Sequence, residues 1–141
     1  KAEYQNFTWR LEYRYPRPAQ FDEAKFPGNT GFLVFITGEH KIWPICLEVQ
    51  GKPVQMGIVK ENGGAQAPEL EDDDAVRQRV RKPVGEWQRL EIVAKDGALT
   101  VTLNDEVVCR SQPAFLSSGP IGIQAENQPF IIRRMRIRKD E

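Results

Sequence analysis

The sequence lacks long apolar runs and the motifs that mark the large enzyme classes. Its longest apolar stretch, residues 31–37, is far shorter than the ~20 residues that cross a bilayer, so we expect no transmembrane helix. No phosphate-binding loop, no Gly-x-Ser-x-Gly nucleophile elbow and no run with metal-ligand spacing is present. We therefore expect neither a metal nor a cofactor, and most large enzyme classes are excluded.

The sequence also lacks an excess of charge of either sign. Twenty Lys and Arg residues balance twenty Asp and Glu residues, so no overall field draws the chain toward nucleic acid or an anionic membrane surface. The expected partner is neutral or locally recognised. With 141 residues the chain can close one hydrophobic core, and we predict a single domain, residues 1–141.

Cysteine is scarce, with only Cys46 and Cys109 in the chain. Their spacing matches no zinc pattern, and spacing alone does not show whether they lie within bonding distance. They form either one disulfide, as in an exported protein, or two free thiols, which are common in protein cores.

What the sequence does contain is a series of short segments with the two-residue period of β-strands. Apolar and polar residues alternate from Phe7 to Tyr15, whereas residues 31–37 are apolar on both parities, as in a strand covered on both faces. Turn signals such as Asp96-Gly97 and Asn104-Asp105 separate the later segments. The expected strands are residues 7–15, 31–37, 42–49, 54–59, 86–95, 98–103, 106–110, 121–126 and 130–138, with a short helix at 73–82 inside a long loop. This pattern predicts an all-β sandwich or barrel.

Two of these strands carry the same polar pattern. Alternation projects Glu48 and Gln50 from one face of their strand and Gln124 and Glu126 from one face of another. If the two strands were neighbours in one sheet, the four side chains would form a polar floor with two carboxylates able to act as acid and base. The competing interpretation is a solvated strand face, because Glu and Gln are mostly exposed residues.

Three further residues are candidates for contact with a ligand. Trp43 is an aromatic plate of the kind that stacks on sugar rings, although tryptophan is more often a core residue. His40, the only histidine, can carry a proton near neutral pH, although a lone loop histidine usually has no such role. Arg133 lies in a terminal strand that we interpret as having a solvated cationic side, and a buried guanidinium there needs a carboxylate or carbonyl partner.

Several motifs occur in an order and spacing that resemble the 3-keto-disaccharide hydrolase domain family. They are Asn29-Thr-Gly31, Trp43-Pro44 followed by Cys46-Leu-Glu-Val-Gln50, Lys82-Pro-Val-Gly-Glu-Trp87, Asn104 in its hairpin, and Gly119-Pro-Ile-Gly-Ile-Gln-Ala-Glu126. The resemblance covers the chain from Tyr4 to Arg138. It implies a concanavalin-like jelly-roll sandwich of two antiparallel sheets, a saccharide ligand, cleavage of 3-keto-glycosides, and a secreted or periplasmic bacterial location.

Together, the paired polar strands, the further ligand-contact candidates and the resemblance suggest roles for the candidate residues. Glu48 and Glu126 become the catalytic pair, and the substrate-binding candidates are Gln50, Gln124, Arg133, Trp43, Asn29 and His40. The sequence departs from the family at Asp105, where Gly is usual, and around Arg133, where the arginine is kept and its neighbours are lost. The family's amino-terminal strands are missing from this sequence. Either they were trimmed, or a homo-oligomer or partner chain covers their position.

Two other function classes compete with the enzyme. One is a non-catalytic carbohydrate-binding module, in which the same polar floor holds a sugar without cleaving it. The other is a structural or interaction β-sandwich domain. The fold serves all three roles and does not discriminate among them.

Overall fold

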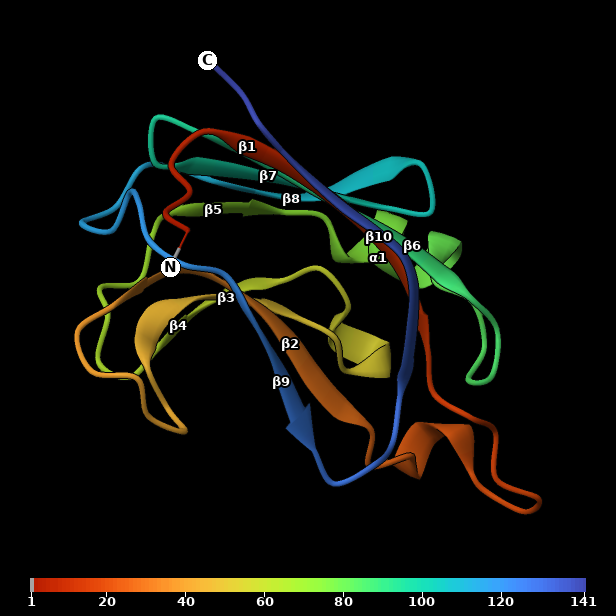
Figure 1. Ribbon diagram of the computed structural model, residues 1–141. Coiled ribbons are helices and arrows are strands. Elements are labelled where there is room, and N and C mark those ends of the chain that lie inside the picture. The colour runs from red at the N-terminus through yellow and green to blue at the C-terminus, as the bar shows by residue number, and fades with distance from the viewer. Residues whose placement is uncertain (1) are drawn as a thin grey trace.

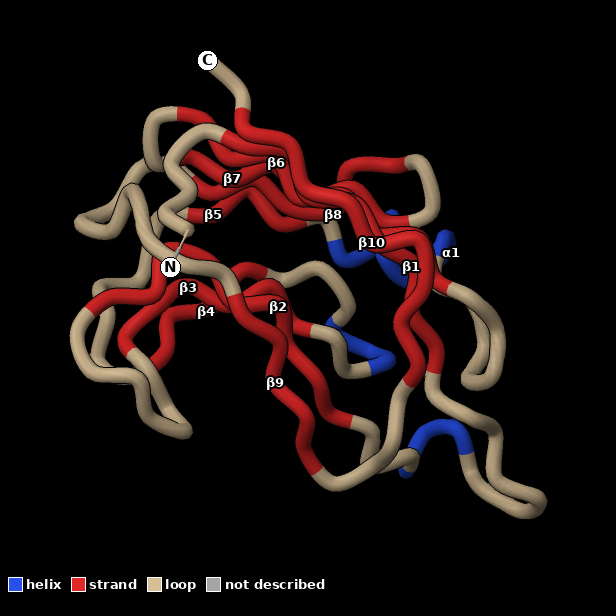
Figure 2. Tube along the Cα trace, in the orientation of Figure 1, coloured by secondary structure: helices blue, strands red, loops and turns tan. Residues whose placement is uncertain are grey.

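The computed structural model describes residues 2–141 and contains two antiparallel sheets packed face to face (Figure 1). Figure 2 shows the strands in two layers, with the helical turns confined to the connections. The predicted all-β sandwich is confirmed. Its elements are β1 (Phe7–Arg14), β2 (Asn29–Thr37), β3 (Ile45–Gln50), β4 (Val59–Asn62), β5 (Leu70–Asp72), α1 (Asp74–Val80), β6 (Gln88–Lys95), β7 (Ala98–Leu103), β8 (Glu106–Ser111), β9 (Gly122–Glu126) and β10 (Ile131–Lys139), with 3-10 turns at Glu23–Lys25 and Pro53–Gln55.

The larger sheet has six strands in the order β10-β1-β6-β7-β8-β5. Its central strands form a meander because two tight turns join them. Asp96 and Gly97 adopt positive φ angles of 49° and 84°, and Asn104 and Asp105 adopt 47° and 77°. Two successive positive φ angles suit the right-handed twist of a hairpin, and Asn, Asp and Gly tolerate that conformation best.

The smaller sheet has four strands in the order β4-β3-β2-β9. Its central strand β2 is buried along almost its whole length, as its apolar residues on both parities predict. Phe32 and Val34 face the larger sheet within the main core, whereas Leu33 and Ile36 form a small separate cluster with Cys46.

Aromatic side chains dominate the core between the sheets. From β1, Phe7, Trp9 and Tyr13 are at most 1% exposed. The Trp9 and Tyr13 rings meet Phe32 of the opposite sheet edge-on, with ring centroids 5.9 and 5.2 Å apart, the geometry that aromatic pairs favour. The Tyr15 hydroxyl donates a hydrogen bond of 2.8 Å to the carbonyl oxygen of Gly51, which ties the end of β1 to the smaller sheet.

The long connection after β3 differs in part from the prediction. The helix at 73–82 is confirmed as α1, whose amino terminus is capped by the Asp73 carboxylate accepting from the Val76 amide. The strand predicted at 54–59 is wrong, because Pro53 opens a 3-10 turn and Gly57 has a φ of 86°. The strand begins only at Val59 and pairs with β3.

The cysteine alternatives are resolved in favour of two free, buried thiols. Cys46 belongs to the small apolar cluster, whereas Cys109 lies in the main core. Burial raises the pKa of each thiol to about 11, so neither is a nucleophile at neutral pH. Within residues 2–141, no helix combines the length and apolar character needed to cross a membrane.

Candidate functional site

The four polar side chains predicted to share a face do share one, on the outer side of the smaller sheet. Their strands, β3 and β9, are not direct neighbours as hypothesised, because β2 lies between them. Gly31 of β2 pairs with Gln50 on one side and with Gln124 on the other. Alternation from these pairs places Glu48 and Glu126 on the same face as both glutamines.

Gly31 provides the space for the Glu48 carboxyl group. A Cβ atom on Gly31 would lie 2.6 Å from Cδ and 2.8 Å from Oε2 of Glu48, closer than non-bonded atoms allow. The Glu48 side chain therefore lies across the bare backbone of β2 toward the centre of the face. The Asn29-Thr-Gly31 motif thus has a steric role that the sequence did not reveal.

Glu126 approaches the same strand from the other edge. Its Oε2 atom accepts a hydrogen bond of 2.7 Å from Nδ2 of Asn29. Asn29 and Gly31 are two residues apart on β2, a spacing of about 7 Å in an extended strand. The two carboxyl groups therefore lie beside neighbouring positions of one strand face, close enough that the charge of Glu126 contributes to the raised pKa of Glu48.

Burial and charge set the protonation of Glu48. Only 8% of the residue is exposed, and this burial, with a smaller contribution from the negative charge of Glu126, raises its pKa. The positive charges of Lys60 and Lys52 oppose the shift. A carboxyl group with a raised pKa is a stronger base, once ionised, than an ordinary glutamate.

Lys60 is a site residue that the sequence analysis missed. It lies on β4 directly opposite Glu48, and its Nζ atom donates a hydrogen bond of 2.8 Å to Oε1 of Gln55. Because residues 60–85 were interpreted as a loop, no pairing with β3 was expected. No alternation marks this strand, because two apolar residues, Ile58 and Val59, are followed by three polar ones.

The Gln50 amide is fixed by the backbone that follows it. Its Oε1 atom accepts hydrogen bonds from the amides of Gly51, at 2.9 Å, and Lys52, at 3.2 Å. This orientation leaves the NH₂ group of Gln50 as a donor beside Gly31. Gln50 is 5% exposed, so it forms part of the floor of the site.

Two hollows lie along β9 at the edge of this face. One, of about 410 Å³, is lined by Glu126, Asn29 and Lys52. The other, of about 500 Å³, is lined by Gln124 and by the loop after β2 that carries His40. The structure therefore brings His40 to the same edge as Gln124. Trp43 belongs to the same loop and is 50% exposed, which leaves an aromatic surface free next to the hollow.

Arg133 is not brought to this group. It lies on β10 of the larger sheet, where its Nε and Nη2 atoms donate to Oε1 of Glu12 at 3.0 and 2.8 Å. Its guanidinium also stacks on Trp87, 3.8 Å from the ring centroid. The expected carboxylate partner of Arg133 is thus Glu12.

The part of the chain that the structure describes holds no group of three or more His, Cys, Asp or Glu side chains that could hold a metal ion. The site consists of two glutamate carboxyl groups, two glutamine amides, an asparagine amide and a lysine amine. These groups can hold hydroxyls and move protons. That chemistry agrees with the motifs that suggested the family.

The sequence matches the family described as the 3-keto-alpha-glucoside-1,2-lyase-like domain over residues 1–138. The chain belongs to this family. It is therefore a carbohydrate-related domain, as the ordered motifs predicted. Among curated proteins, none matches the chain.

Solved structures with the same fold include two proteins of Parabacteroides distasonis described as proposed glycosyl hydrolases. The first is 16% identical with a TM-score of 0.69, and the match covers 99% of this chain and 74% of the Parabacteroides chain. The second is 21% identical with a TM-score of 0.66 and covers 99% and 80%. The carbohydrate-binding module CBM66 from Bacillus subtilis is 12% identical with a TM-score of 0.62 and covers 97% and 77%. At these identities the likeness shows the fold alone.

Proposed function

We propose that the outer face of the smaller sheet binds a 3-keto-glycoside and cleaves its glycosidic bond. The observation that carries this proposal is the placement of Glu48 over Gly31, with Glu126 beside Asn29 on the same strand face. Two carboxyl groups there can act on one sugar ring. Membership of the 3-keto-alpha-glucoside-1,2-lyase-like family supports the class of substrate.

The reaction begins with proton removal. A ketone at C3 acidifies the proton on C2, and the Glu48 carboxylate takes that proton as general base. The electron pair forms a C1–C2 double bond conjugated with the ketone, and the C1–oxygen bond breaks. Glu126 donates a proton to the departing oxygen. Water then adds across the double bond, its oxygen at C1 and a proton at C2, so the net reaction is hydrolysis.

The remaining polar groups orient the sugar. The Gln50 NH₂ group, fixed through its carbonyl oxygen, donates to an oxygen of the substrate. Gln124 and Asn29 hold hydroxyl groups at the edge of the face, and Lys60, opposite Glu48, stabilises negative charge that develops on the ketone oxygen. His40 and Trp43 contact the group attached to C1.

Turnover of a 3-keto-glucoside by the purified chain tests this proposal. We expect Glu48→Gln to lower kcat by about 10² to 10⁴, the usual contribution of a general base. Glu61→Gln, an exposed residue on the neighbouring strand β4, is the matched control and should leave the rate unchanged. An unchanged rate in Glu48→Gln would remove Glu48 from the mechanism.

A binding module is the second candidate, favoured by the half-exposed Trp43 beside the hollow that contains Gln124. An exposed aromatic face next to amide groups can hold a sugar without cleaving it. Calorimetry with a panel of glycans distinguishes the two. Saturable binding that Trp43→Ala abolishes, with no product after long incubation, would establish the module instead of the enzyme.

A further inference from the structure

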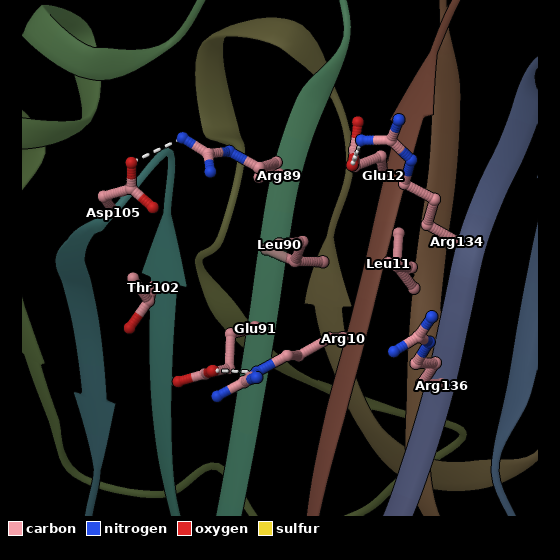
Figure 3. A pocket seen from close by; sticks show the side chains of 10 residues that line it. All are labelled: Arg10, Leu11, Glu12, Arg89, Leu90, Glu91, Thr102, Asp105, Arg134 and Arg136. Carbon is pink, nitrogen blue, oxygen red and sulfur yellow. Dashed lines mark hydrogen bonds and ion pairs between the residues drawn. The ribbon is translucent and has the colours of Figure 1, made fainter.

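A second polar surface lies on the outer face of the larger sheet, opposite the candidate site. Arginines from three neighbouring strands gather there and line a hollow of about 540 Å³ (Figure 3). Four arginines face three carboxylates in this hollow: Arg10, Arg89, Arg134 and Arg136 against Glu12, Glu91 and Asp105. None of these residues belongs to the site described above.

Strand register places two of these arginines directly opposite each other. Arg136 of β10 pairs with Arg10 of β1, and Arg10 pairs in turn with Glu91 of β6. The Nε atom of Arg10 donates to Glu91 at 2.6 Å. Arg136 has no carboxylate partner among residues 2–141. Like charges opposite each other on neighbouring strands are unfavourable. Arg136 nevertheless lies opposite Arg10, and its positive charge is not neutralised by a carboxylate.

A β-bulge concentrates further positive charge on the same face. The register between β1 and β10 shifts between the pairs Arg10↔Arg136 and Glu12↔Arg133, and Arg134 within the bulge has a φ of 53°. That conformation is costly for a residue other than glycine. Regular alternation would send neighbouring residues to opposite faces, whereas both Arg133 and Arg134 bind Glu12 here, with Nη1 of Arg134 at 3.1 Å.

The hollow continues into a second one of about 510 Å³. Glu12, Arg89 and Arg134 line both. The second hollow adds Arg133, Lys82, Glu86 and the Trp87 ring, so six cationic side chains face four carboxylates along the two hollows. Two joined hollows, each within the usual size of a small-ligand pocket, form a continuous cationic groove suited to an extended chain.

We propose that this groove, here called the arginine groove, binds an anionic polysaccharide that carries carboxylate groups. The arginines already hold carboxylates in the geometry that such a ligand would use: Arg133 through two nitrogen atoms on Glu12, and Arg89 on Asp105 at 2.5 Å. The planar guanidinium fork matches a carboxylate. Arg136 binds a carboxylate of the polysaccharide. Arg133 and Arg134, which share the single carboxylate of Glu12, bind another.

The fixed carboxylates argue against nucleic acid as the occupant. Duplex DNA carries one negative charge per about 1.7 Å of helix axis, so many of its charges would lie against Glu12, Glu91 and Asp105. A chain with at most one carboxylate per sugar can place its charges at the arginines between those acids. The arginine groove and the proposed catalytic face lie on opposite outer surfaces of the sandwich, so both can be occupied together.

Binding to polygalacturonate at low ionic strength tests the proposal, measured by affinity electrophoresis and calorimetry. The variant Arg134→Gln/Arg136→Gln should weaken binding by about tenfold or more, because charge-assisted hydrogen bonds to two arginines are lost. Lys95→Gln/Arg110→Gln removes the same charge from the same sheet outside both hollows and should change affinity by less than about twofold. Arg136→Gln alone breaks no ion pair and should also weaken binding of polygalacturonate. A thermal midpoint equal to that of the wild type would show that its loss of affinity does not reflect misfolding.

Three results would overturn the proposal. They are no binding of polygalacturonate by the wild-type chain, equal losses in the control variant, and equal affinity for duplex DNA of matched length. Glu48→Gln should leave polygalacturonate binding unchanged, so this experiment fails or succeeds independently of the catalytic proposal.

Discussion

At the scale of single residues, Gly31 has the largest consequence for the candidate site. Its backbone is extended and its φ angle is ordinary, so an alanine there is acceptable to the strand. The alanine methyl group would nevertheless occupy the space of the Glu48 carboxyl group. The glycine is thus required by a neighbouring side chain and not by the main chain.

Gly31→Ala should therefore separate activity from folding. We expect turnover of a 3-keto-glucoside to fall by about tenfold or more, because small displacements of a catalytic group have large effects on rate. The midpoint of thermal unfolding should change much less. Gly64→Ala is the complementary control. Nothing lies within 4 Å of its new Cβ atom, but its φ of 91° strains an alanine, so this variant should lose stability and keep activity. Wild-type turnover in Gly31→Ala would show that the position of Glu48 is irrelevant.

The raised pKa of Glu48 predicts how stability depends on pH. Burial favours the protonated form in the folded state, so the contribution of Glu48 to stability is full below its unfolded pKa and is lost as the pH rises through the folded value. Glu48→Gln should therefore unfold at a higher temperature than the wild type at pH 7, with the difference disappearing below about pH 4.

Glu12→Gln provides the opposite case for comparison. The hydrogen bond from Arg133 is the largest cause that lowers the pKa of Glu12, so this carboxylate stabilises the folded state above its unfolded pKa, and that stability is lost at lower pH. The Glu12 variant should be less stable than the wild type at pH 7. The account would be contradicted if both variants shifted the thermal midpoint in the same direction.

At the scale of elements, α1 depends on one buried guanidinium. The helix has seven residues, too few to be stable alone. Arg77 is fully buried, donates from Nε to the carbonyl oxygen of Met56 at 2.6 Å, and pairs with Asp72 of β5 and with Asp74. It therefore joins the helix, the edge strand and the connection before β4.

Arg77→Met should destabilise the domain by about 1 to 3 kcal/mol, because the Met56 carbonyl oxygen loses its donor and the partly exposed carboxylate of Asp72 loses its partner. Urea unfolding measures this change. Arg79→Met, on the same helix but in an exposed ion pair with Glu106, should cost less than about 1 kcal/mol. Equal losses in the two variants would show that burial of Arg77 contributes nothing.

Elements with a clear alternation or turn signal were predictable, and those shaped by bulges were not. The hairpin at Asn104-Asp105 pairs Leu103 with Glu106 as a two-residue loop requires. A bulge then shifts the register, so that Val101 faces Cys109, whereas regular pairing beyond a two-residue loop would place Val108 there. Cys109 consequently points into the core. A bulge adds a residue without a composition signal, and alternation alone therefore misplaces every side chain beyond it.

At the scale of the whole molecule, the two sheets carry different chemistry on their outer faces. The paired polar strands were recognisable from sequence because Glu48 and Gln50 repeat the spacing of Gln124 and Glu126. Their separation by β2 was not, since strand order in a sheet depends on long-range pairing. The displacement of Arg133 to the larger sheet has the same cause.

In the proposed reaction, Glu48 removes the C2 proton of a bound 3-keto-sugar. Proton NMR of a 3-keto-glucoside incubated in D₂O with the wild-type chain or Glu48→Gln tests it most directly, with free 3-keto-glucose as the control for spontaneous exchange. We expect a product deuterated at C2 from the wild type and no comparable product from the variant. Product that keeps its C2 proton, or deuterated product formed by Glu48→Gln at the wild-type rate, would contradict it.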